Sequence, residues 1–164
     1  MIPDVCGLVR RDHDDIDRAL AAMVDPRTPV DELVMLLDVL RLALAVHVTA
    51  EARVFRTLLE KVPAPAALGL IVMHARDEHA RQHDALDELG AVRVGGDAWY
   101  GLALELRVLV LDHASRAELI RWTLQDHVPL TSHRALAREY AIERMRVLAR
   151  TSPVALARAQ LLVG

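Results

Sequence analysis

Apolar residues recur at intervals of three and four along most of the chain, the spacing that places side chains on one face of an α-helix. Proline and glycine interrupt this pattern in a few places, and both favour turns and helix ends over helix interiors. The interruptions are Asp25-Pro26, Thr28-Pro29, Pro63-Ala64-Pro65, Gly95-Gly96-Asp97 and Val128-Pro129. Between them the pattern predicts helices near residues 4–24, 29–62, 66–90, 98–127 and 132–150, and a short helix that begins at Ser152-Pro153.

No stretch of the chain alternates apolar and polar residues in the manner of a half-buried strand, so the pattern predicts an all-α fold. The connections between the first four helices are short, which favours antiparallel neighbours. We expect residues 1–127 to form an up-down-up-down four-helix bundle. Residues 128–164 would form a C-terminal extension of two additional helices packed on the same domain.

Each of the first four predicted helices carries a histidine where its apolar face would otherwise continue. In the first helix His13 lies on the face formed by Val9 and Ile16, and in the second His47 shares a face with Leu40. If neighbouring helices are antiparallel and in register, these interruptions fall at one level of the bundle and create a shared polar cavity. The candidate ligands of that cavity are His13, His47, Glu51, His79, His83, His113 and Glu118.

In two of these helices, a second candidate ligand lies one turn after the histidine. Glu51 lies four residues after His47, and His83 lies four residues after His79. Four residues of α-helix amount to about 40° around the axis, so each pair faces the same side. An ionised glutamate in a dry core is costly unless it is neutralised, paired with a cation or bound to a metal.

The fourth helix departs from this spacing, because Glu118 follows His113 by five residues, or about 140° around the axis. The length of the glutamate side chain or a π-bulge would be needed to bring it inward. On the third helix His74 and Glu78 form a rival pair. We prefer the pair that begins at His79, because His79 lies closer to the apolar face, and keep Glu78 as a further candidate ligand.

Composition narrows the classes of function. The chain has 164 residues, 53% of them apolar, and a formal net charge of −3, with its arginines scattered rather than clustered. These values describe one globular domain and give no basis for binding nucleic acid. One cysteine excludes an intrachain disulfide framework. The N-terminal residues lack the apolar core of a signal peptide, so we expect a cytoplasmic protein without a membrane partner.

The candidate ligands indicate which metal to expect. Imidazole and carboxylate groups without thiolates favour iron or manganese, with zinc also possible. Seven protein groups exceed the four of a structural zinc site and would suit two adjacent ions bridged by carboxylates. Helical bundles that bind two irons through Glu-x-x-His pairs are a known alternative, but no histidine in this chain has glutamate three residues before it.

The order of these residues resembles that of the hemerythrin and HHE cation-binding family, whose ligands follow the sequence His, His-x3-Glu, His-x3-His and His-x4-Asp/Glu along four helices. Here His13 lies in DHDDIDRAL, and the next two elements lie in HVTAEARVF and HARQH. The fourth lies in HASRAE. The resemblance covers roughly residues 5–124. Any one of these motifs is weak evidence, whereas the ordered set of four is fairly specific.

The resemblance implies a hemerythrin-like bundle with a non-haem di-iron site. It implies that His79, His83 and His113 bind one iron, that His13 and His47 bind the other, and that Glu51 and Glu118 bridge them. Such a site binds dioxygen reversibly, senses it, or takes part in handling iron and small reactive molecules. An apolar pocket would protect it, and the candidate wall residues are Ile16, Phe55, Leu86, Leu109 and Ile120.

The sequence leaves three hypotheses open. The one we favour is a di-iron protein that binds dioxygen or another small diatomic molecule or peroxide without being an enzyme. The second is a metal-dependent enzyme acting on peroxide or nitric oxide. The third is a structural or signalling module without a metal. The C-terminal helices offer a face for a homodimer.

Overall fold

The structure, a computed structural model, describes residues 4–61 and 66–151 and contains five helices in that part of the chain. They are α1 (Val5–Met23), α2 (Val30–Lys61), α3 (Ala66–Ala91), α4 (Asp97–His127) and α5 (Leu130–Thr151). The predicted all-α class is confirmed, and each predicted helix end lies within two residues of the observed one. The short helix expected at Ser152-Pro153 lies outside the described residues.

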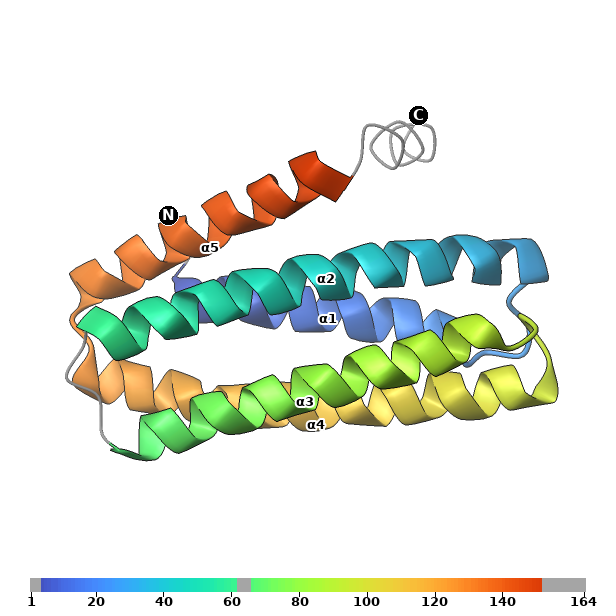
Figure 1. Cartoon of the computed structure of the whole chain (residues 1–164), viewed down its shortest axis with the longest axis horizontal. Coiled ribbons are helices and arrows are strands. Elements are labelled where there is room, and N and C mark those ends of the chain that lie inside the picture. Colours follow the sequence, from blue (N-terminus) through green and yellow to red (C-terminus); the bar gives the residue numbers. More distant parts are fainter. Residues whose placement is uncertain (1–3, 62–65, 152–164) are drawn as a thin grey trace.

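Helices α1 to α4 lie side by side, and the direction of the chain reverses at each connection between them (Figure 1). Contacts join α1 to α2 and to α4, and α3 to α4 and to α2, so the four helices close a ring around one interior. Helix α5 lies outside this ring. It packs against α2 and α1, obliquely to α2 and on the side away from α3 and α4 (Figure 1).

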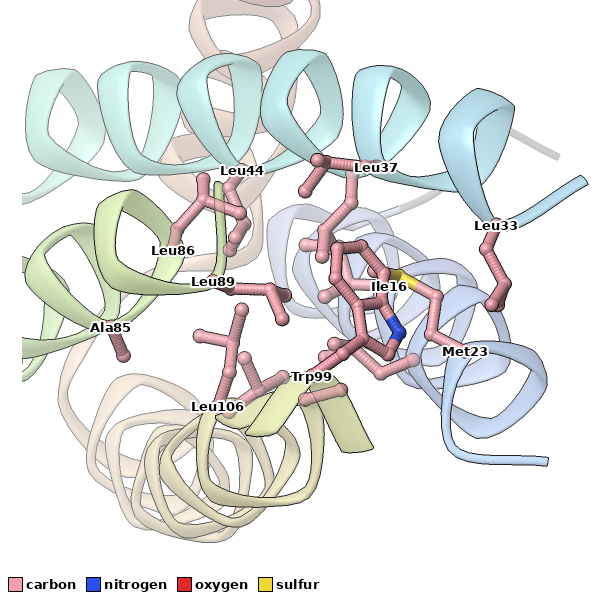
Figure 2. Close-up of a cluster of buried hydrophobic side chains, with 14 residues drawn as sticks. Ile16, Met23, Leu33, Leu37, Leu44, Ala85, Leu86, Leu89, Trp99 and Leu106 are labelled. Atoms are coloured by element: carbon pink, nitrogen blue, oxygen red, sulfur yellow. The ribbon is translucent and has the colours of Figure 1, made fainter. Parts of the chain in front are cut away.

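Two separate clusters of buried apolar side chains fill the interior. The first apolar cluster lies towards the α3–α4 turn, and side chains from all four helices converge in it (Figure 2). It consists of Ile16, Leu20, Met23, Leu33, Leu37, Leu40, Leu44, Ala85, Leu86, Leu89, Trp99, Ala103, Leu106 and Val110. The second apolar cluster includes α5 and consists of Val5, Ala50, Val54, Phe55, Leu58, Ala75, Val128, Leu136, Ala137 and Tyr140.

The boundary between the two clusters falls at the histidines. Along α2, Leu44 belongs to the first cluster and Ala50 to the second, with His47 between them. Along α3, Ala75 and Ala85 lie on either side of His79 in the same way. A polar layer therefore divides the apolar interior into two parts.

The ends of two helices show how the sequence sets these boundaries. The carboxylate of Asp4 accepts a hydrogen bond from the backbone N–H of Gly7 at 2.7 Å and caps the start of α1. Between α3 and α4, Gly95 has a φ of 72°, a left-handed conformation that glycine adopts without the penalty of a side chain. The turn at Gly95 allows α4 to fold back along α3.

Helix α2 is the most apolar of the five. Residues Val30–Glu60 are long and apolar enough to cross a membrane, by length and composition alone. The core helix of a soluble protein meets the same criterion, and α2 packs against α1, α3 and α5. The expected absence of a membrane partner stays a prediction.

Candidate metal centre

The polar layer brings together four histidines and one glutamate from four helices. His13 comes from α1, His79 from α3 and His113 from α4, whereas α2 supplies both His47 and Glu51. All five side chains are buried. Ligand atoms of His13, His47, Glu51 and His113 lie within 4.8 Å of one another, a grouping that could hold a metal ion.

The imidazoles form two close pairs. The Nε2 atoms of His13 and His47 are 3.1 Å apart, and those of His79 and His113 are also 3.1 Å apart. Two nitrogens bound to one first-row metal ion at about 2.1 Å each would lie about 3.0–3.4 Å apart. The spacing of each pair therefore suits two ligands of one ion.

Glu51 lies between these pairs. Its Oε2 atom is 2.9 Å from Nε2 of His79, 3.3 Å from Nε2 of His113 and 3.8 Å from Nε2 of His47. These approaches lack the direction of hydrogen bonds, so within the described part of the chain neither oxygen of Glu51 has a hydrogen-bond partner. A carboxylate that is 1% exposed is costly in this state, and a bound cation would remove the cost.

The Nδ1 atom of His47 has its hydrogen-bond partner outside the cluster. The Tyr140 hydroxyl donates a hydrogen bond to Oδ2 of Asp12 at 2.6 Å and lies 3.1 Å from Nδ1 of His47. Because its one proton goes to Asp12, the hydroxyl accepts from the Nδ1–H of His47. Arg144 completes the group, with Nη2 3.0 Å from Oδ1 of Asp12. In neutral His47, Nε2 then presents its lone pair to the cluster.

A second group of the same kind holds His113. Its Nδ1–H donates a hydrogen bond to Oε2 of Glu78, with 2.9 Å between the two atoms. Glu78 in turn pairs with the guanidinium of Arg116. Histidine ligands of metal sites commonly donate their second N–H to a carboxylate or another acceptor in this way. Glu78, kept above as a further candidate ligand, therefore accepts a hydrogen bond from Nδ1 of His113, whereas Nε2 of His113 faces the cluster.

The protonation of the cluster favours a cation. Burial lowers the pKa of His13 to about 4 and lowers the pKa of His47 well below its ordinary value. Burial disfavours the charged form of Glu51, but the imidazoles of His113 and His79 outweigh it and hold the pKa of Glu51 low. Burial also opposes a charge on His113, yet Glu51 and Glu78 raise its pKa. An ionised carboxylate thus lies beside the neutral imidazoles of His13 and His47.

Two of the seven expected ligands are not brought into this cluster. The side chain of His83 is 74% exposed, and its Nδ1 atom pairs with Asp87 at 3.3 Å. Glu118 accepts a hydrogen bond from Nε of Arg10 at 3.1 Å and is partly exposed. The helical rotation of about 140° between His113 and Glu118 explains why their side chains point differently. His74, the rival to His79, is exposed.

Cavities border the cluster in several places, one of them beside His113 and Glu78. One of about 270 Å³ is bordered by His13 and Glu51, with Val5, Val54 and Phe55 among its apolar walls and Arg10 and Glu118 also lining it. Another of about 420 Å³ is bordered by His79 and Leu86.

The expected pocket wall is only partly in place. Of its five residues, Phe55 and Leu86 line these cavities. Ile16 belongs to the first apolar cluster and Leu109 packs against it, since both point into the packed half of the bundle. The side chain of Ile120 lies outside the described residues.

The residues behind the ligands are the part of the site that the sequence did not indicate. Asp12 and Tyr140 are both buried and are hydrogen-bonded to each other. Their sequence separation is 128 residues, and no local pattern predicts such a contact. The available signal was the position of Asp12 next to His13 in the chain.

Comparisons of the chain with protein-family models, with curated proteins and with solved structures found no match. The interpretation of the site rests on its own geometry. That geometry is a buried cluster of imidazoles and one carboxylate with no thiolate, which could hold a metal ion.

Proposed function

We propose that the cluster binds two metal ions, with His13 and His47 on one ion, His79 and His113 on the other, and Glu51 between them. The observation that supports this most is the arrangement of two imidazole pairs, each with 3.1 Å between Nε2 atoms, around a buried carboxylate that lacks a hydrogen-bond partner. Four imidazoles and one carboxylate exceed what one tetrahedral ion takes.

Iron is the ion we propose, with manganese or zinc as substitutes, because the donors are imidazole and carboxylate. The protein would then be a hemerythrin-like di-iron protein that binds or senses dioxygen, or takes part in iron handling. When bound, a reduced di-iron centre supplies the electrons that reversible binding of dioxygen requires. Five protein donors leave coordination positions open on two ions, and these positions are available to a small ligand.

The protein residues around the centre have distinct tasks in this proposal. Asp12 accepts a hydrogen bond from the Tyr140 hydroxyl behind His47, and Glu78 accepts one from Nδ1 of His113, and both contacts keep an imidazole oriented inward. Val54 and Phe55 give the cavity beside His13 an apolar wall that admits a small uncharged molecule more readily than an ion.

The direct test is metal content. Protein loaded with Fe(II) without oxygen should retain about two ions per chain after desalting, and its absorption should change on exposure to air and revert when oxygen is removed. One ion per chain would contradict the two-ion arrangement. Iron at trace levels only would contradict the proposal as a whole and favour a metal-free structural role.

One alternative uses the cavity of about 270 Å³ beside His13, which has room for hydrogen peroxide or nitric oxide as well as for dioxygen. A metal-dependent enzyme acting on peroxide or nitric oxide would use the same cluster. Iron-loaded protein would then consume hydrogen peroxide over many turnovers, and His47→Ala would abolish this activity. Retention of peroxide consumption in that variant would assign the activity to free iron.

A further inference from the structure

Tyr140 is the contact through which the fifth helix reaches the candidate metal centre. It lies on α5, which supplies none of the five clustered ligands. Its buried hydroxyl donates to Asp12 at 2.6 Å and lies 3.1 Å from Nδ1 of His47. A side chain from outside the ring of four helices thus determines which nitrogen of His47 carries the proton.

Arg144, one turn further along α5, reaches the same carboxylate, with Nη2 3.0 Å from Oδ1 of Asp12. Asp12 therefore holds two residues of α5 and, through Tyr140, the ring of His47. If α5 separated from α1 and α2, Nδ1 of His47 would lose its partner. The ring could then carry its proton on Nε2, the atom that faces the cluster.

We infer that docking of α5 and loading of the metal centre are coupled through Tyr140, so that each stabilises the other. This rests on the proposed metal binding. The docked helix fixes His47 with the Nε2 lone pair directed inward, and the undocked helix does not. Because the ion binds the docked form more tightly, linkage requires that the ion also hold α5 in place. Tyr140 is in this sense a positioning residue.

The test uses the full chain with and without Zn(II), which avoids oxidation. In the wild type, zinc should slow hydrogen exchange at α5 amides about tenfold or more, and Tyr140→Phe should remove most of that effect. The same variant should bind zinc about ten- to a hundredfold more weakly in chelator competition, the usual cost of losing such a partner of a histidine ligand. Tyr100→Phe, a half-buried tyrosine packed against the first apolar cluster, is the matched control and should change neither value.

A second variant separates coupling from general loosening. The Thr57 hydroxyl donates to Glu139 at 2.6 Å and ties α5 to α2 without touching the cluster. Thr57→Val should speed hydrogen exchange at α5 amides by a similar factor with and without zinc. The ratio of the zinc-free rate to the zinc-bound rate should therefore stay at its wild-type value. In Tyr140→Phe the ratio should approach one.

Nitrogen NMR of the histidines in zinc-free protein adds a measurement that a purely structural role would not change. His47 should carry its one proton on Nδ1 in the wild type, whereas Tyr140→Phe should show a mixture of the Nδ1–H and Nε2–H tautomers. Zinc binding without slower α5 exchange, or an unchanged His47 tautomer in the variant, would overturn the coupling and leave metal binding intact. Failure of the wild type to bind any ion would overturn the proposed function and the coupling with it.

Discussion

His79 and His83 lie one turn apart on α3, yet their side chains are 7% and 74% exposed. If the clustered residues bind metal, His79→Ala should lower metal affinity about tenfold or more, whereas His83→Ala should leave it unchanged. Chelator competition on the two variants measures both values under identical conditions. A comparable loss in His83→Ala would mean that α3 turns further inward than the structure shows.

The difference between these two histidines also marks the limit of the sequence pattern. His83 lies about 40° to one side of His79 around the helix, and Gln82 lies about 60° to the other side. In the structure Gln82 is 2% exposed, and its amide donates to the Leu109 carbonyl at 3.3 Å. Spacing alone places both residues near the inner face, and only packing against α4 decides which is buried.

His13 makes the stability of the metal-free protein depend on pH. Its pKa falls from 6.5 to about 4 on folding, so between these values the unfolded chain binds a proton that the folded chain does not. Lowering the pH from 7 to 5 should therefore cost about 2 kcal/mol through this group. Urea unfolding at the two pH values measures the loss, and His13→Gln should show a loss smaller by about that amount. Equal pH dependence in both proteins would contradict the lowered pKa.

At the level of the helices, the turn between α3 and α4 is where a single backbone conformation is required. Gly95 has a φ of 72°, and an added Cβ would lie 3.1 Å from Cγ2 of Val30. Gly95→Ala should destabilise the protein by about 1–3 kcal/mol, because other residues are strained in this conformation.

The control for this substitution is Gly101, an exposed glycine within α4 that has no atom within 4 Å of an added Cβ. Gly101→Ala should stabilise the helix by about 0.5–1 kcal/mol. Changes of opposite sign in the free energy of unfolding, measured by chemical denaturation, would show that the backbone conformation of each glycine decides the effect. Destabilisation in both variants would point to packing at Gly101.

The helices themselves could be predicted because each has a repeating apolar face bounded by proline or glycine. Pro29 immediately before α2 and Gly95-Gly96 immediately before α4 are examples, because proline and glycine favour turns and helix ends over helix interiors. The role of α5 could not be predicted, because its key contacts join Tyr140 and Arg144 to Asp12 on α1. Such contacts depend on how helices pack and leave no trace in local spacing.

For the whole molecule, metal binding should appear as thermal stability. An ion present at about a hundred times its dissociation constant adds about 2.7 kcal/mol, which for a chain of this size raises the melting temperature by about 5–10 °C. Melting curves with zinc and with chelator measure the shift. In Glu51→Leu the shift should vanish, because the carboxylate that lies between the two imidazole pairs is gone. A shift that persists in this variant would place the ion elsewhere.

The polar layer described above has a consequence for how the bundle comes apart. It separates two apolar clusters that share α1, α2 and α3 but do not pack on each other across the histidines. Within each cluster, burial of apolar surface holds the helices together. At the polar layer, the contacts between helices are made by polar groups. Without an ion, we expect the two halves to loosen independently, as neighbouring cooperative units do. Two ions held by residues of all four helices, with Glu51 between them, would make the two halves unfold as one body, so occupancy of the site would set the cooperativity of the whole fold.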